Sequence, residues 1–137
     1  ARFTATMRRY PVGTSPMPTG VNMSRHHYYL SIADLAHARG DDPRFSYDGV
    51  DPRSFATILQ QSLRDDGLFQ RWRAVQPDPD AVDASLGHAD PEAQVSAHLA
   101  GLHTEVDLVT SLPMSVVRHR LYLLVGSAWQ LRDLRAA

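Results

Sequence analysis

The last third of the chain, residues 97–135, constrains the fold most, because apolar and polar residues alternate along it. Successive side chains of a β-strand point to opposite faces of a sheet, so this alternation predicts strands with one apolar face. Gly126-Ser127 suits a two-residue hairpin turn with glycine at its first central position. Pro113-Met114 suits an earlier turn. The segment 94–137 is therefore predicted to form a three-stranded antiparallel meander.

The register of this meander divides its side chains into two sets. It places Arg120 between Asp107 and Asp133, and it pairs Leu124 with Trp129. One face then combines charged and aromatic residues: Glu105, Asp107, Arg118, Arg120, Tyr122, Trp129 and Asp133. The opposite face is mostly aliphatic and carries Val106, Leu108, Val117, His119, Leu121, Leu123, Val125 and Leu134, with Gln130 and Arg132 as polar exceptions. His119 on that face is interpreted as a hydrogen-bonded core histidine.

Residues 52–75 carry the clearest helical pattern. Asp51 suits an N-cap and Pro52 suits the first turn. Apolar residues recur on one stripe at Phe55, Ile58, Leu59, Leu63, Phe69 and Trp72. Gly67 costs about 1 kcal/mol relative to alanine, so a break is expected there. This long amphipathic helix is expected to pack on the aliphatic face of the meander.

Residues 25–39 fit two structures. Tyr28, Ile32, Leu35 and Arg39 fall at helical spacing, and Gly40 suits the position after a helix. The run Tyr-Tyr-Leu-Ser-Ile instead favours a strand. We favour the helix, keep the strand as the alternative, and predict that residues 25–75 are mainly helical.

The chain of 137 residues is long enough for one domain of the α+β class. Residues 1–24 are expected to form a short strand (Phe3–Tyr10) and a Pro/Gly-containing arm (Pro11–Ser24). Residues 76–93 are expected to be an acidic linker with one short helical turn. A three-stranded sheet has two edges, so an N-terminal strand or a partner chain is expected to cover one of them.

Two absences exclude several chemistries. The chain has no Cys, which excludes disulfides and thiolate zinc sites, and all 14 of its basic residues are Arg, which excludes a Schiff-base lysine. The net charge of −1 gives no overall attraction to nucleic acid or to a membrane. The absence of a long apolar run predicts a soluble, cytoplasmic protein without membrane contact. A Lys-free composition rich in Arg, Asp and Ala indicates a bacterial gene of high GC content.

Arginines and aromatic rings are interleaved in four places. These are Arg8-Arg9-Tyr10, Arg25-His26-His27-Tyr28-Tyr29, Arg71-Trp72-Arg73 and Arg118-His119-Arg120-Leu121-Tyr122. Single-stranded nucleic acids are bound by this combination of residues, with guanidinium groups on phosphates and rings on bases. The candidate binding surface comprises Arg118, Arg120, Tyr122, Trp129, Asp107 and Asp133. The two aspartates would neutralise Arg120, which favours a structural role for this face.

The sequence predicts no catalytic, cofactor-binding or metal-binding residue. No two histidines have the i, i+4 spacing of a metal pair on one helix. The acidic residues between Asp78 and Glu92 lack the glycine and distal Glu of an EF-hand loop. No Gly-x-Ser-x-Gly nucleophile motif is present.

These observations favour a non-catalytic protein-interaction or adaptor module, either a monomer or a weak homodimer. Met17 and Met23 in the Pro11–Ser24 arm would suit an adaptable contact with a protein partner. The first alternative is single-stranded nucleic-acid binding through Arg118, Arg120, Tyr122 and Trp129. The second alternative is a metal-dependent hydrolase that uses Asp and His.

Overall fold

The structure is a computed structural model that describes residues 25–137. The strand predicted at Phe3–Tyr10 and the Pro11–Ser24 arm therefore lie outside the described residues. The chain has an α+β fold with a four-stranded antiparallel sheet. Its elements are β2 (His26–Ile32), α1 (Pro52–Arg64), α2 (Gly67–Ala74), β3 (Gln94–Ala100), β4 (His103–Thr110), α3 (Met114–Val125) and β5 (Gln130–Ala136). Short 3-10 turns occur at Leu35–His37, Pro79–Ala81 and Ala84–Gly87.

The strands are arranged in the order β3-β4-β2-β5, with β2 and β4 at the centre. The helices α1 and α2 connect β2 to β3, and α3 connects β4 to β5. This βαββαβ arrangement is the split-βαβ, or ferredoxin-like, topology. Proteins of unrelated function share it, so the topology alone does not define what the protein does.

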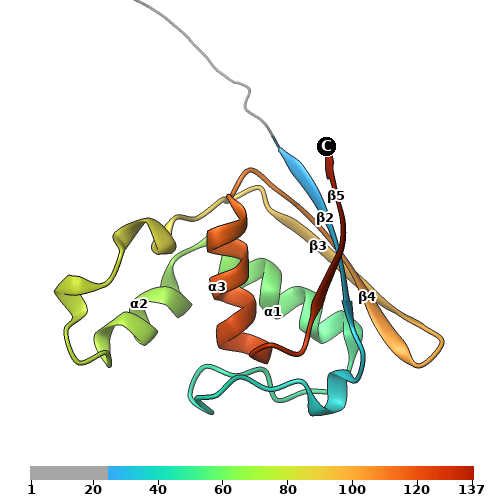
Figure 1. Ribbon diagram of the computed structural model, residues 1–137, viewed down its shortest axis with the longest axis horizontal. Coiled ribbons are helices and arrows are strands. Elements are labelled where there is room, and N and C mark those ends of the chain that lie inside the picture. Colours follow the sequence, from blue (N-terminus) through green and yellow to red (C-terminus); the bar gives the residue numbers. More distant parts are fainter. Residues whose placement is uncertain (1–24) are drawn as a thin grey trace, which may run out of the picture.

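One face of the sheet forms the core. On β2 the side chains of Tyr28, Leu30 and Ile32 alternate into the interior, and on β4 Val106 and Leu108 do the same. Figure 1 shows α1 and α3 packed on this face, with α2 further from the sheet. The predicted direction of Val106 and Leu108, toward a covering helix, is thus confirmed.

The helical prediction for residues 52–75 is confirmed, including its break. The Asp51 side chain accepts hydrogen bonds from the backbone N–H groups of Arg53 and Ser54, which caps α1. The helix ends at Arg64, and α2 begins at Gly67. Three residues of the apolar stripe on α1, Phe55, Leu59 and Leu63, are fully buried.

The prediction of a three-stranded C-terminal meander is wrong in its middle strand, because residues 114–125 form the helix α3. Pro113 is the N-cap of this helix instead of part of a hairpin turn. Seven of its residues are buried, on more than one side: Val116, Val117, Arg120, Leu121, Leu123, Leu124 and Val125. A helix buried on several sides loses the one-sided apolar stripe that identifies amphipathic helices, so alternate apolar residues resemble a strand.

The turn predicted at Gly126-Ser127 does form, although it joins a helix to a strand. Gly126 has φ 63° and ψ −126°, the geometry of the first central residue of a type II′ turn. The backbone N–H of Ala128 donates to the carbonyl of Val125 at 3.1 Å, which closes the turn. The glycine was therefore a correct turn signal, but it did not imply a hairpin.

The preference for a helix at residues 25–39 is also wrong, since this segment contributes the central strand β2. Tyr28 and Ile32, two of the residues at helical spacing, are buried together with Leu30, because the three alternate with period two along β2. Pairing with β4 on one side and β5 on the other satisfies the backbone of this strand along both edges. The alternative left open by the sequence is the correct one.

Candidate functional site

The structure does not bring the six residues of the predicted binding surface together on one sheet face. Arg118, Arg120 and Tyr122 belong to the helix α3, and Trp129 lies between the turn at Gly126-Ser127 and β5. The predicted pairing of Arg120 with Asp107 and Asp133 is therefore wrong. Asp107 pairs with Tyr29 across the β2–β4 ladder, and Asp133 pairs with the same tyrosine from β5.

Arg120 is completely buried, with 0% of its surface exposed. Its Nε donates to the carbonyl of Ser62 at 2.8 Å and its Nη2 to the carbonyl of His88 at 2.9 Å, while Nη1 donates to the carbonyl of Leu86. Burial lowers the pKa of this guanidinium, and the charges of Asp66 and Asp65 oppose that effect. Arg120 thus ties α1 and the 84–88 segment to α3, and its charge is not available to a ligand.

The remaining helical members of the predicted surface are separated from the open side of the sheet. Arg118 is exposed on α3, and the hydroxyl of Tyr122 donates to Oδ2 of Asp41 at 2.9 Å. His119 packs edge-on against Trp72 at 4.5 Å between ring centroids, and within residues 25–137 its Nδ1 has no hydrogen-bond partner. The interpretation of His119 as a hydrogen-bonded core histidine is therefore wrong for Nδ1. Burial, with the charge of Arg120 as a smaller cause, lowers the pKa of His119.

A different surface combines charged and aromatic groups, namely the face of the sheet opposite α1 and α3. Within residues 25–137 no helix covers this open face (Figure 1). Because side chains alternate along each strand, the open face receives every second residue, except in β5, where an irregularity brings the successive residues Arg132 and Asp133 to it. Its polar and aromatic members are His27, Tyr29, Ser31, Gln94, Ser96, His98, His103, Glu105, Asp107, Gln130, Arg132, Asp133 and Arg135.

Two of the three carboxylates of this face, Glu105 and Asp107, lie on the central strand β4, and the third, Asp133, lies on β5. Oε1 of Glu105 is 3.4 Å from Nε2 of His98, and Oε2 is 3.3 Å from Nε2 of His103. The Glu105 side chain remains 50% exposed. Oδ1 of Asp107 is 3.2 Å from Nε2 of His27, which in turn stacks on Tyr29 with ring centroids 4.0 Å apart. Since imidazoles are charged only when protonated, these partners leave the two carboxylates with net negative charge whenever the rings are neutral.

The cations of the open face lie on β5. Arg135 donates from Nε to Oδ2 of Asp133 at 2.8 Å, and its guanidinium is 5.5 Å from the centre of the Tyr29 ring. Arg132 donates to the side-chain oxygen of Gln130 at 3.3 Å. The charges of the face are therefore unevenly distributed: β4 carries two carboxylates, β5 carries two guanidinium groups and one carboxylate, and Tyr29 lies on the strand between them.

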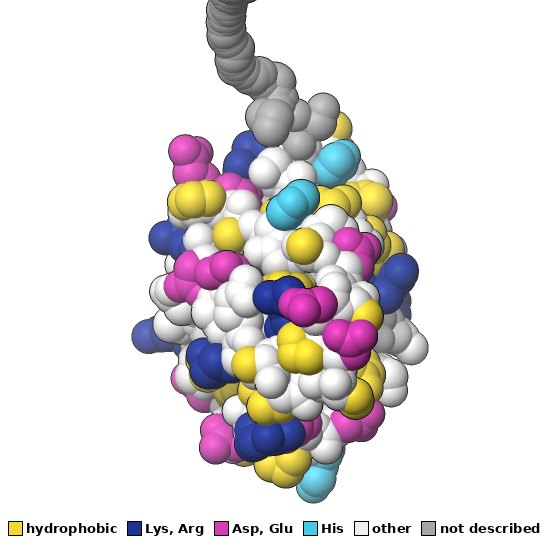
Figure 2. Space-filling view, turned by 90° about the vertical axis from the view of Figure 1, so that its left-hand side faces the viewer, with side chains coloured by type: hydrophobic (Ala, Val, Ile, Leu, Met, Phe, Trp, Pro, Cys, Tyr) yellow, Lys and Arg dark blue, Asp and Glu magenta, His cyan; other side chains and the backbone are white. Residues whose placement is uncertain are grey.

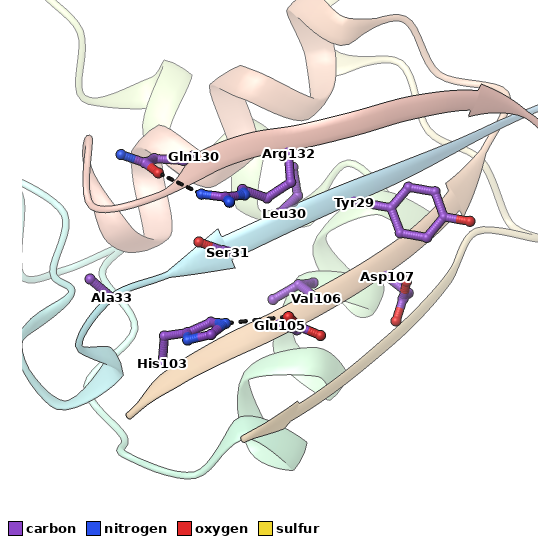
Figure 3. Close-up of a pocket in the computed structure, with 10 residues that line it drawn as sticks. All are labelled: Tyr29, Leu30, Ser31, Ala33, His103, Glu105, Val106, Asp107, Gln130 and Arg132. Carbon is purple, nitrogen blue, oxygen red and sulfur yellow. Dashed lines mark hydrogen bonds and ion pairs between the residues drawn. The ribbon is translucent and has the colours of Figure 1, made fainter. Parts of the chain in front are cut away.

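A hollow of about 470 Å³ opens between these strands. Figure 3 shows Glu105 and Asp107 on one side of it, Arg132 and Gln130 on the other, and Tyr29 and Ser31 between the two groups. The hollow is polar at both walls, whereas pockets for small ligands are mostly apolar.

On the side of the molecule that carries α2, side chains of different kinds are not separated from one another. Figure 2 shows acidic, basic and apolar side chains interspersed over that side.

The other predicted chemistries find little support in the described part of the chain. Among residues 25–137, no three His, Asp or Glu side chains are close enough to hold a metal ion. The acidic linker contains two 3-10 turns, and its Asp90 is buried instead of solvated. Asp90 accepts hydrogen bonds from Thr110 at 2.7 Å and from the backbone N–H of Ser111 at 3.1 Å, and Arg25 lies 3.3 Å away. These contacts give Asp90 a structural role.

The sequence identified part of the open face and missed the rest. Glu105 and Asp107 were placed correctly on the polar side of β4, and the cluster from Arg25 to Tyr29 was noted as a mixture of cations and rings. The sequence did not point to Arg132. The predicted meander paired the strand that contains Arg132 with residues that form the helix α3 in the structure. The strand signal of the Tyr-Tyr-Leu-Ser-Ile run would have located Tyr29 correctly.

No helix in the described residues is long and apolar enough to span a membrane. Comparisons of the chain with models of protein families, with curated proteins and with solved structures found no match.

Proposed function

We propose that this chain is a non-catalytic protein-interaction module, whose open sheet face binds a segment of a partner protein that carries basic side chains. The observation that supports this proposal most strongly is the pair of accessible carboxylates, Glu105 and Asp107, on an uncovered central strand. Their neighbours in the described structure are imidazoles, so an arginine or lysine of a partner gains two anionic contacts.

The shape of the site agrees with a side chain of a partner protein as its occupant. The hollow is open and polar, and the Tyr29 ring beside it offers a surface for a guanidinium or ammonium group. Arg132 and Gln130 on the opposite wall supply donors for backbone carbonyls or acidic side chains of the same segment. The arrangement therefore favours a partner segment of mixed charge with a central basic residue.

Single-stranded nucleic acid is the second candidate, now through different residues from those the sequence suggested. Tyr29 on a central strand, with Arg132 and Arg135 on β5, supplies a ring and two cations on one sheet face. Against this candidate, Glu105 and Asp107 would repel phosphates from the neighbouring strand.

A selection from a random peptide library displayed on phage tests the proposal with the full chain immobilised. Recovered peptides are expected to be enriched in Arg or Lys. Their affinity should fall at least about tenfold for the double variant Glu105→Gln/Asp107→Asn, which removes both charges with little change in shape. Asp80→Asn is the matched control, because that carboxylate is fully exposed on the Pro79–Ala81 turn, away from the open face.

Two results would reject the proposal. The first is recovery of peptides whose affinity is unchanged in the double variant. The second is low-salt binding of a ten-residue oligothymidylate that is lost in Arg132→Gln and strengthened in Glu105→Gln, which would establish the nucleic-acid alternative instead. The affinity of that oligonucleotide should also fall steeply as salt is raised.

A further inference from the structure

The two outer edges of the sheet differ in how their backbone groups are covered. At the β3 edge, the helix α1 supplies partners: the N–H of Val95 donates to Oε1 of Gln60 at 3.0 Å, and Nε of Arg64 donates to the carbonyl of Ala93 at 2.7 Å. At the β5 edge, all seven strand residues are exposed, and no element of residues 25–137 lies beyond it. An uncovered strand edge is a template for pairing with another strand.

An irregularity in β5 gives this edge an unusual pattern of side chains. Leu131 pairs with Leu30, but Asp133 already pairs with Tyr29, so Arg132 is an extra residue between them. The extra residue shifts the alternation of the strand. As a result, Leu131 and Leu134 both point to the helix side of the sheet although they are three residues apart. They are 42% and 46% exposed, so the uncovered edge carries two apolar side chains on one side.

We propose that the outer edge of β5 pairs with β5 of a second copy of this chain, antiparallel and about a twofold axis. In this register Leu131 lies opposite Leu134 of the second copy on the helix side. Arg132 lies opposite Asp133 of the second copy on the open side. The twofold axis repeats each pair, so the contact contains two leucine pairs and two ion pairs. The two sheets then form one continuous sheet.

The edge of β5 is complementary to the same edge of a second copy, because each leucine lies opposite a leucine and each charge lies opposite a charge of the other sign. In the single chain the N–H of Leu134 donates to Oδ1 of the neighbouring Asp133 at 2.8 Å. On pairing, this N–H donates to a backbone carbonyl of the second copy, and Oδ1 of Asp133 accepts instead from Arg132 of that copy, while Oδ2 keeps its hydrogen bond from Arg135. The contact is short, and small interfaces are weak, so the dimer is expected to dissociate on dilution. This inference does not depend on the proposed function of the open face.

Sedimentation velocity of the full chain over a range of concentrations tests the dimer. Arg132→Asp and Asp133→Arg each place like charges opposite one another twice, and each is expected to weaken the dimer at least about tenfold. The double variant Arg132→Asp/Asp133→Arg exchanges the charges and restores both ion pairs, so its dimer should return to about the original affinity. Ser96→Arg, an added charge on the exposed β3 strand, is the control and should have no effect.

The register can be tested separately, because the chain has no cysteine of its own. A mixture of Leu131→Cys and Leu134→Cys chains should form an interchain disulfide faster than either variant alone, since only the mixture brings the two thiols opposite each other. A full chain that stays monomeric at millimolar concentration overturns the proposal. The proposal is also overturned if the affinity of the dimer is unchanged in both single charge variants. It is overturned as well if Asp133→Cys chains on their own form the disulfide fastest.

Discussion

The two faces of the sheet use charged residues in opposite ways. On the helix-covered side, Arg120 is buried and all three of its nitrogens donate to backbone carbonyls. On the open side, Glu105 is half-exposed, and within residues 25–137 its ion-pair partners are the imidazoles of His98 and His103. A buried charge must be satisfied by the protein itself, because unpaired burial is very costly. An exposed charge has no such requirement, and it remains available to a partner.

The largest loss of stability is expected for Arg120→Met. This change leaves three carbonyls, one in a buried and two in part-buried hydrogen bonds, without their donor, and it should lower the free energy of unfolding by about 3 kcal/mol or more. Urea denaturation followed by circular dichroism measures this loss. Arg118→Met, two residues earlier and exposed on the same helix, is the control and should change stability by no more than about 0.5 kcal/mol. Equal losses in the two variants would contradict the structural role of Arg120.

A smaller effect is expected for Asp90, the buried carboxylate at the end of the 76–93 segment. Burial acts to raise the pKa of Asp90, but hydrogen bonds from Thr110 and from the N–H groups of Glu92 and Ser111, together with the charge of Arg25, outweigh it and hold the pKa below the ordinary value. At pH 7 the change Asp90→Asn should cost about 2 kcal/mol.

The pH dependence of that difference has a definite sign. A depressed pKa in the folded state stabilises the protein above the ordinary aspartate pKa of about 3.9, and this contribution is lost as the pH falls through the folded value. The stability difference between the original chain and Asp90→Asn should therefore be constant from pH 7 to about pH 5 and shrink below about pH 4. A difference that stays constant down to pH 2 would contradict this account.

Gly126→Ala should have an intermediate cost of about 1 to 2 kcal/mol, because its positive φ disfavours a side chain. A Cβ atom at this position would also lie 2.8 Å from the carbonyl oxygen of Arg39. Gly101→Ala is the matched control, since Gly101 has a similar φ of 69° but open space around its Cβ position. Thermal unfolding should show the larger loss for Gly126→Ala, and the reverse order would show that the close approach is unimportant.

The smallest effect on stability is expected for Glu105→Gln on the open face, at no more than about 0.5 kcal/mol. Leu108→Ala, on the same strand but facing the core, should cost about 3 kcal/mol by leaving a cavity. Chemical denaturation of the two variants measures the contrast. A large loss of stability in Glu105→Gln would mean that the contacts of Glu105 with imidazoles stabilise the fold. The Glu105 carboxylate would then be less available to a partner.

Some elements followed from local patterns alone. The cap at Asp51 and Pro52, the stripe through Phe55 and Leu63, and the break near Gly67 identified α1 and α2 correctly. The alternation along β4 placed Val106 inside and Glu105 outside. These signals are local, because helix capping and side-chain alternation depend on neighbours a few residues apart.

The sequence by itself determined the α+β class, the helices between residues 52 and 74, the turn at Gly126 and the two faces of β4. Only the tertiary structure decided that residues 114–125 form a helix, that residues 26–32 form the central strand, and which side chains meet on the open face. The physical reason is burial: β2 and α3 contact neighbours on several sides, so packing outweighs local preference, and the partners that set their environment lie far away in the sequence.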